Sequence, residues 1–308
     1  MSQQQPGIIP EPSEHARFVI LRVLEPAKDA RRVATFLAGA PALAAKVAAL
    51  DRRARFVWTV GIGPEFWDRV SPRRRPRTLR QFSAIDLDGR TAPSTGGDLL
   101  FHLVSKRPDL NFEFARRLTV GLGDSVTVMD DVAGFRYLDS RDLTGFIDGT
   151  ENPKGKARAA AALIGAEDPA FAGGSYVFTQ RYVHDLTKWA AISLREQEGA
   201  IGRRKRDSTE LSARVKPPTA HISRVVIEEN GEELEIVRHS FPYGTVTEAG
   251  LFFIAYTKDL AIPERMLSRM MGSAGDGLHD RLMDFTQAVS GATFFAPSLR
   301  ILKSLGPR

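Results

Sequence analysis

A glycine-flanked segment carries the acidic residue best placed for chemistry. In the stretch 143–155, LTGFIDGTENPKG, Gly145 precedes Asp148 and Gly149 follows it directly. Glycine frees the backbone and lets it approach a flat ligand closely, so a carboxylate held here can be presented into a pocket. The spacing Gly-x-x-Asp-Gly is not specific, because an aspartate that stabilises a turn or caps a helix commonly gives the same pattern. Both interpretations stay open on these residues alone.

A second polar group lies on an expected strand, EIVRHSF, at Arg238. An arginine in such a run usually faces water or pairs with an acid, and Glu210 or Glu235 could be that acid. Its guanidinium is always charged and donates several hydrogen bonds, which suits it to stabilising negative charge. Because side chains alternate along a strand, Ser240 shares its face and His239 points the other way, so we expect His239 to be non-catalytic.

Any metal must be held by histidine, carboxylate or carbonyl oxygen, because the chain has no cysteine. That absence excludes disulfides, thiolate catalysis, iron–sulfur clusters and a cysteine-ligated haem. The six histidines are His15, His102, His184, His221, His239 and His279. His221 follows two prolines and enters an apolar segment, which fits either a ligand or a packed side chain. We expect structural or surface roles for the other five.

Composition indicates an ordinary globular protein, with 308 residues, 43% hydrophobic and 26% charged. No apolar run reaches the roughly 20 residues of a membrane span, and residues 1–12 lack a secretory signal, so we expect no membrane association and a cytoplasmic location. The net charge of +6 comes largely from basic runs at 73–80 and 203–206. Aromatic residues are not interleaved with them, so we interpret both as solvated loops and expect no nucleic-acid partner.

The first half of the chain alternates strands and helices in the order β-α-β-β-α-β, the pattern of a ferredoxin-like unit. Pro41 predicts a break or a kink in the first helix, and Gly134 predicts a turn between two final extended segments. The expected strands are 17–24, 55–60, 99–104, 126–132 and 135–138, and the expected helices are 29–50 and 108–118.

The second half predicts a looser version of the same unit. Ser193 and Glu196 form a capping-box pattern, and Asn230-Gly231 is a strong hairpin signal. The expected strands are 175–182 and 251–257, and the expected helices begin at Asp185, at Ser193, at Pro263 (to about Met271) and at His279 (to about Val289). We therefore predict an α+β fold of tandem ferredoxin-like halves, 1–140 and 141–308, with antiparallel sheets and helices packed outside.

The segment GFIDGTENP resembles the distal haem loop of the dye-decolourising peroxidases, in the form typical of the bacterial B-type subfamily. The resemblance covers essentially the full chain. It continues through QPGI at the N-terminus, GDLLFHL from Gly97, GGSYVFTQRYVHDLTKW from Gly173, PPTAHISR from Pro217, EIVRHSFPYG from Glu235 and GLFFIAYTKDL from Gly250.

The resemblance implies one haem b per chain, bound in the C-terminal half. His221 matches the proximal iron ligand, and Asp148 and Arg238 match the distal catalytic pair. Arg238 and Thr150 are expected to contact the cofactor, and Gly145, Gly149 and Ser240 to form the distal pocket. Ser240 departs from the family, which usually has asparagine there. A ligating imidazole needs a partner on its other ring nitrogen; Asp280 is the first candidate and Glu210 the second.

The implied reaction reduces hydrogen peroxide and oxidises small aromatic donors, such as phenols, dyes and lignin-like compounds, through an oxo-ferryl intermediate. The alternative is a haem-handling protein that binds haem, delivers it or removes its iron, with incidental peroxidase activity. A haem-free ferredoxin-like binding module is a third hypothesis. Family resemblance also favours a homo-oligomer. Because the chain stops soon after FFAPSLRILKSLG, we expect no packaging in an encapsulin shell.

Overall fold

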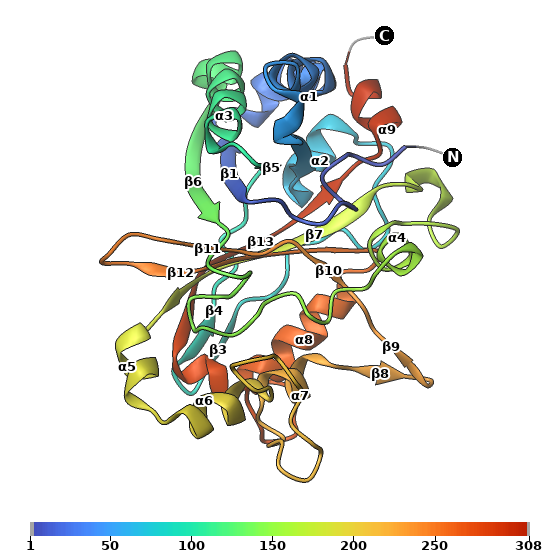
Figure 1. Cartoon of the computed structure of the whole chain (residues 1–308). Coiled ribbons are helices and arrows are strands. Elements are labelled where there is room, and N and C mark those ends of the chain that lie inside the picture. The colour runs from blue at the N-terminus through green and yellow to red at the C-terminus, as the bar shows by residue number, and fades with distance from the viewer. Residues whose placement is uncertain (1–2, 307–308) are drawn as a thin grey trace.

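The computed structural model describes residues 3–306. Its N-terminal half is a four-stranded antiparallel sheet covered by helices (Figure 1). Its strands lie in the order β6-β1-β5-β2. All seven residues of β5 are buried, because neighbours pair on both sides and the faces are covered. The elements are β1 (His15–Val23), α1 (Pro26–Ala48), β2 (Val57–Ile62), α2 (Pro64–Val70), β5 (Leu99–Ser105), α3 (Pro108–Leu122) and β6 (Val126–Phe135).

The C-terminal half repeats the arrangement with strands in the order β11-β12-β7-β13. If the four strands of each half are numbered in chain order, both half-sheets have the order 4-1-3-2: β6-β1-β5-β2 in the N-terminal half and β13-β7-β12-β11 in the C-terminal half. The predicted pair of ferredoxin-like halves is therefore confirmed. The elements are α4 (Lys156–Ala162), β7 (Ser175–His184), α5 (Leu186–Ala191), α6 (Leu194–Ile201), α7 (His221–Val225), β10 (Val237–Arg238), β11 (Phe241–Gly244), β12 (Ala249–Thr257), α8 (Ala261–Met271), β13 (Thr286–Ala296) and α9 (Leu299–Ser304).

The two half-sheets join edge to edge into one nine-stranded sheet that includes β10. One seam pairs Gly134 of β6 with Tyr243 of β11, and the other pairs Ile62 of β2 with Phe295 of β13. Gly134 is required at the first seam, because a Cβ atom there would lie 2.6 Å from the Cβ of Phe241. The halves thus share a sheet, and the boundary at residue 140 stays a prediction.

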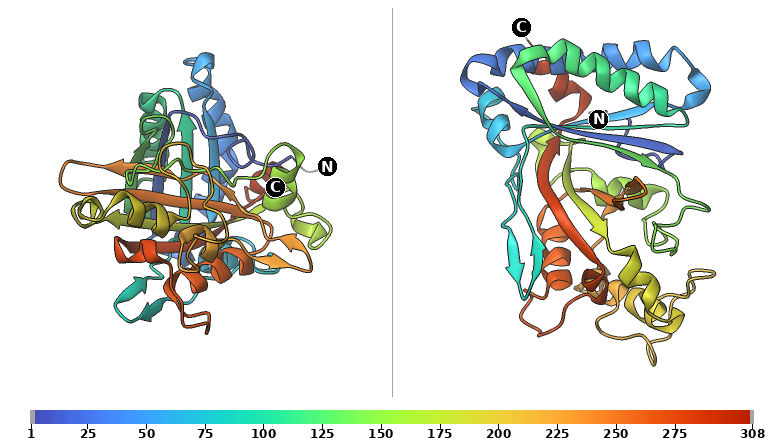
Figure 2. Two further views of the ribbon diagram at one scale, coloured as in Figure 1. Left: turned by 60° about the horizontal axis from the view of Figure 1, so that its bottom comes forward. Right: turned by 90° about the vertical axis from the view of Figure 1, so that its left-hand side faces the viewer.

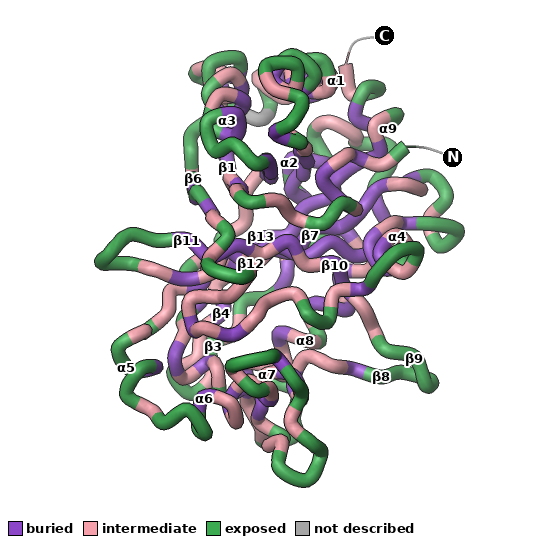
Figure 3. Tube along the Cα trace, in the orientation of Figure 1, coloured by how far each residue is buried: buried purple, intermediate pink, exposed green. Residues whose placement is uncertain are grey.

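Helices lie in layers on opposite sides of this sheet (Figure 2). One layer contains α1 and α3, and the other contains α5 to α8. Two small hairpins project from the second layer: β3 (Ile85–Leu87) with β4 (Arg90–Ala92), and β8 (Glu228–Glu229) with β9 (Glu232–Glu233). The central strands are largely buried, whereas the β8–β9 hairpin is exposed (Figure 3). Among the described residues, no helix is long and apolar enough to cross a membrane.

Three predicted elements differ from the structure. The expected final helix, 279–289, is instead a short 3-10 turn at Arg281–Asp284 followed by β13. Its β-branched and aromatic residues pair with β7 along ten positions, so tertiary pairing overrides a weak helical pattern. Helix α1 continues through Pro41, and Gly134 lies inside β6 instead of forming a turn. The hairpin predicted at Asn230-Gly231 is confirmed by the β8–β9 pairing.

The seam at Phe295 should carry much of the cohesion between the halves. Its ring is fully buried and packs edge-on against Trp67, with centroids 5.0 Å apart, and Phe171, 5.5 Å apart. We expect Phe295→Ala to lower the free energy of unfolding by about 3–5 kcal/mol in urea titration. Val289→Ala, on the same strand but 37% exposed, is the control and should change it by less than about 0.5 kcal/mol. Equal effects from the two variants would contradict this account.

Candidate active site

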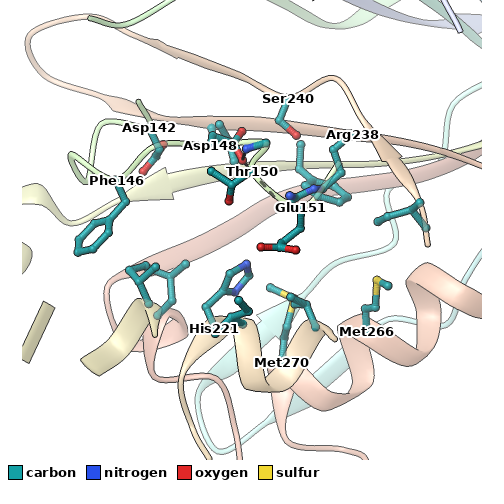
Figure 4. Close-up of a pocket in the computed structure, with 18 of the residues that line it drawn as sticks. Asp142, Phe146, Asp148, Thr150, Glu151, His221, Arg238, Ser240, Met266 and Met270 are labelled. Atoms are coloured by element: carbon teal, nitrogen blue, oxygen red, sulfur yellow. Dashed lines mark hydrogen bonds and ion pairs between the residues drawn. The ribbon is translucent and has the colours of Figure 1, made fainter. Parts of the chain in front are cut away.

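A large, mostly apolar cavity opens between the 142–151 loop, β10 and the helices α7 and α8 (Figure 4). The atom-free space between its walls is about 1430 Å³, a figure that includes the open solvent at its mouth. Its apolar wall includes Phe146, Phe178, Ile222, Val225, Leu251, Phe253, Leu267 and Met270. Polar side chains also line it, with Asp148 and Arg238 on one side and His221 on the opposite side.

Asp148 lies on the upper side of the cavity in Figure 4. Its backbone N–H donates to the Ser140 carbonyl at 3.0 Å, and its Oδ1 accepts from the Gly149 N–H at 2.6 Å. Gly149 has a φ of +77°, a conformation that strongly favours glycine. The turn therefore fixes one carboxylate oxygen and leaves Oδ2 without a hydrogen bond among the described residues.

Arg238 lies beside Asp148, with Nη1 3.9 Å from Oδ1. At that distance the two attract each other without a hydrogen bond, so the guanidinium donors stay available. The backbone around Arg238 is clamped by Asn152, whose side chain accepts from the Arg238 N–H at 2.8 Å and donates to its carbonyl at 2.8 Å. Asn152 thereby ties the loop of Asp148 to the strand of Arg238. The sequence analysis missed this residue, although it lies inside the quoted loop motif.

The other residues expected on this side divide into two groups. Thr150, Gly149 and Ser240 line the cavity. Gly145 is not part of the wall: it has a φ of +87°, and its carbonyl accepts a hydrogen bond from Arg141 at 2.8 Å. The assignment of Gly145 to the distal pocket therefore stays a prediction, and what the structure gives for this residue is its part in the loop backbone.

His221 lies on the opposite side of the cavity, at the start of α7. Its Nδ1 is 2.6 Å from Oδ2 of Asp280, which is fully buried. The other carboxylate oxygen, Oδ1, accepts from the Leu282 N–H at 2.9 Å. Asp280 thus orients the imidazole, as expected for a ligand's partner. The second candidate, Glu210, does not contact His221; it pairs with Lys216 and Arg203, because it lies in the 203–216 loop.

These residues fit a porphyrin held by one imidazole. Among residues 3–306, no group of three or more histidine and carboxylate side chains is arranged to hold a metal ion by itself. An iron bound by His221 therefore needs ligands from a macrocycle. With Nδ1 engaged by Asp280, Nε2 remains for the metal. The apolar walls suit the faces of a porphyrin.

Arg203 is the cavity residue whose cation would pair with the carboxylates that a haem carries. It lines the cavity, and only 15% of its side chain is exposed. It contacts Glu151 and donates to the Ser208 carbonyl at 2.6 Å. The sequence analysis treated the 203–206 run as a solvated loop, which is wrong for this residue. Nothing in a run of basic residues distinguishes the one that folds inward.

His184 and Asp142 form a second polar pair on the cavity wall that the sequence analysis also missed. His184 Nε2 lies 3.1 Å from Asp142 Oδ1, and its Nδ1 lies 2.7 Å from the Thr286 hydroxyl. Burial alone would raise the pKa of Asp142, but hydrogen bonds from His184 and Thr144 outweigh it and hold that pKa below its ordinary value. The pair ties the start of the loop to β7 and β13.

This pair should make the protein's stability pH-dependent. The pKa of Asp142 is depressed in the folded protein, so the ionised group stabilises the fold above its ordinary pKa of 3.8, and this stabilisation is lost as the pH falls through the folded value. We expect Asp142→Asn to lower the free energy of unfolding by about 1.5–3 kcal/mol at neutral pH. The difference from wild type should shrink below pH 3.8. Urea titrations at several pH values measure it, and a difference that grows toward acid pH would contradict the assignment.

Comparison with known proteins places nearly all of the chain in one protein family. Residues 5–136 match the family model of the N-terminal part of Dyp-type peroxidases, and residues 139–301 match the C-terminal part. The dye-decolorizing peroxidase of Mycolicibacterium paratuberculosis is 45% identical over 249 residues, which are 80% of this chain and 70% of the relative. A variant of DypB from Rhodococcus jostii RHA1, solved in complex with heme, is 40% identical with a TM-score of 0.95, covering 99% of this chain and 100% of its own.

One neighbour corrects an expectation. The structure of the encapsulated DyP-type peroxidase from Mycobacterium smegmatis is 39% identical with a TM-score of 0.95, covering 100% of this chain and 99% of that one. The prediction that encapsulin packaging is not expected is therefore wrong. An encapsulated protein matches this chain over almost its entire length, so the position at which the sequence stops carries no information about packaging. With both family models and close relatives in agreement, the chain belongs to the Dyp-type peroxidase family.

Proposed function

We propose that this peroxidase holds the iron of its haem b through His221 and activates hydrogen peroxide with Asp148 and Arg238. The observation that carries the proposal is the arrangement of the cavity. An imidazole oriented by a buried carboxylate lies on one side, and a carboxylate with an adjacent guanidinium lies on the other. Haem peroxidase activity, with dyes among the oxidised donors, follows from the family.

Haem, when bound, supplies the electron-transfer chemistry that cleaves the peroxide bond and oxidises the donor. The chain's own contribution on the peroxide side is proton transfer by Asp148. Its Oδ1 is held by the Gly149 N–H, so Oδ2 takes the proton from one peroxide oxygen and delivers it to the other. A single carboxylate therefore acts first as general base and then as general acid.

Arg238 stabilises the negative charge that develops on the departing oxygen. The guanidinium is charged at every relevant pH, so this contribution does not depend on a proton. Its backbone is fixed by Asn152, which fixes the point on the cavity wall from which the side chain extends. Arg203 and Thr150, which line the cavity, would contact the bound cofactor, and Asp280 holds His221 in one orientation.

Two further predictions from the sequence concern the protein in the cell. We propose a cytoplasmic location and a homo-oligomeric assembly. The family resemblance supports the assembly, and the composition of an ordinary globular protein is the basis for the location.

Replacing the iron ligand should remove the cofactor. We expect His221→Ala to lose haem or to bind it loosely, because a single imidazole links the chain to the iron. Haem content per chain and the absorption spectrum measure this. His279→Ala is the matched control. His279 also pairs with an aspartate, but its partner is Asp284, whereas the partner of His221 is Asp280. An unchanged spectrum in His221→Ala would falsify His221 as the ligand.

Arg238→Leu should slow the reaction with peroxide more than Asp148→Asn does. Loss of a preorganised donor typically costs on the order of 100-fold or more. Loss of a proton-transfer group costs roughly 100- to 10,000-fold when nothing replaces it. Water can replace Asp148 in part, because Ser240 is shorter than the usual asparagine and leaves room for it.

Stopped-flow mixing of each ferric protein with peroxide measures the decay of the resting absorption band. Arg265→Leu is the control, because this half-exposed arginine of α8 pairs with Glu229 away from the peroxide groups. A larger loss in Asp148→Asn would reverse the order. No loss in either variant would show that the distal pair is misplaced.

A further inference from the structure

A buried arginine behind the cavity joins three distant segments of the chain. Arg158, on α4, is only 5% exposed. Its Nε donates to the Ile9 carbonyl at 2.8 Å, and its Nη2 donates to the Pro10 carbonyl at 3.3 Å. Nη1 reaches the Pro153 carbonyl at 3.4 Å, and Nη2 lies 2.9 Å from Nε2 of His239. A buried guanidinium is costly unless its donors are satisfied, and this one is satisfied by carbonyls and an imidazole.

The contact with Arg158 fixes the state of His239. A guanidinium only donates, so Nε2 must accept and the ring proton must lie on Nδ1. The Gly7 backbone carbonyl takes that proton in a hydrogen bond. Burial, followed by the neighbouring His102 and Arg158, lowers the pKa of His239 well below its ordinary value, so the ring stays neutral. His239 is therefore a fixed link between Arg158 and the N-terminal arm, residues 5–10.

This link acts directly on the residues proposed to activate peroxide. His239 stands between Arg238 and Ser240 in the chain, with its side chain directed away from the cavity. Pro153, whose carbonyl is another of the four contacts of Arg158, directly follows Asn152, which clamps the backbone of Arg238. Arg158 thus holds from behind both the strand of Arg238 and the loop of Asp148.

The N-terminal arm completes the assembly from a distant part of the sequence (Figure 1). Gln5 is fully buried and donates to the carbonyls of Val60 at 2.8 Å and Pro297 at 2.9 Å. The Gly7 N–H donates to the Trp58 carbonyl at 3.0 Å. A Cβ atom at Gly7 would lie 2.8 Å from the Trp58 carbonyl carbon, so any side chain there would displace the arm. The arm is therefore anchored on β2 and presents its carbonyls to Arg158 and His239.

We propose that Arg158 and His239 are positioning residues, which hold Arg238 and Asp148 in register from behind the cavity, with the N-terminal arm as an integral part of that wall. The proposal rests on the roles proposed above for Asp148 and Arg238. Neither Arg158 nor His239 touches the peroxide; they act through the backbone of the residues that do.

Paired variants of the haem-loaded enzyme test the proposal. Arg158→Met and His239→Leu remove the contact, and each should lower the rate constant for peroxide per haem-loaded molecule by about 10- to 100-fold, the effect of a displacement near 1 Å. His239→Gln should retain most of the rate constant, because its amide oxygen accepts from Arg158 and its amide nitrogen donates to Gly7. Gly7→Ala should act like His239→Leu by moving the arm.

A second readout does not depend on activity. In the haem-free protein, the backbone amides of Asp148 and Arg238 should exchange with deuterium faster in Arg158→Met and His239→Leu than in wild type, and at the wild-type rate in His239→Gln. Asn111→Ala is the matched control. Asn111 is a buried residue of α3 whose side-chain amide donates to the His15 carbonyl at 3.1 Å, so this variant also removes a hydrogen bond from a buried side chain to a backbone carbonyl. It should lower the melting temperature but leave unchanged both the rate constant for peroxide and the deuterium exchange of the Asp148 and Arg238 amides.

The outcomes separate this inference from the proposed function. If Arg158→Met and His239→Leu lower only the melting temperature, as Asn111→Ala does, the positioning role is overturned. If Arg158→Met does not fold, the two His239 variants still decide: the positioning role is overturned if His239→Leu and His239→Gln have the same rate constant for peroxide and the same deuterium exchange rates. If Arg238→Leu leaves the peroxide reaction unchanged, the proposed distal pair fails, while deuterium exchange still decides whether Arg158 and His239 order those segments.

Discussion

The hydrogen bond between His221 and Asp280 constrains the rest of the site. A fully buried carboxylate is expensive unless its oxygens are paired, and Asp280 pairs one with the imidazole and the other with the Leu282 N–H. Its own N–H donates to the Met270 carbonyl, at the end of α8. The bond therefore fixes the imidazole relative to α8 as well as fixing its tautomer. In the proposed function, an iron held by this ring would leave the peroxide to bind on the side where Asp148 and Arg238 lie.

The duplicated fold explains why one half of the molecule holds the site. Both halves have the same strand order, but their helices differ in length and packing. In the N-terminal half, α1 and α3 lie directly on the sheet and fill its outer face with apolar side chains. In the C-terminal half, shorter helices and loops leave a cavity between the sheet and α7 with α8. The N-terminal half contributes through its arm and through the seams at Gly134 and Ile62.

The parts of the site that the sequence predicted are those in which local pattern and chemistry coincide. The glycines around Asp148 signal a turn, and the turn orients one carboxylate oxygen. Strand alternation correctly separated His239 from Arg238 and Ser240, although the strand itself is interrupted between β10 and β11. The first candidate for the His221 partner, Asp280, is the residue found beside it, but only the fold brings positions so far apart together.

The missed residues share a physical cause. Arg203, His184 and Asn152 act through contacts made by folding, and their neighbours in sequence give no sign of those contacts. Arg203 turns inward because Glu151 and the Ser208 carbonyl accept from it, whereas the adjacent Arg204 and Arg206 are exposed. The final helix failed as a prediction for the same reason: β7 offers ten pairing positions to residues 286–296, and local propensity cannot compete with a complete ladder.

Ser240 shows how a departure from the family pattern is absorbed. Its hydroxyl lies 3.4 Å from the Ile254 N–H on β12, so its oxygen is engaged with the strand behind it. A serine is also shorter than an asparagine and reaches less far over the cavity. In the proposed function, Asp148 and Arg238 are therefore the two side chains of this wall that would meet the peroxide. The distance of 3.9 Å between Arg238 Nη1 and Asp148 Oδ1 then becomes the quantity that the surrounding structure must control. Asn152 fixes it from within the loop, and the contacts of Arg158 brace it from behind.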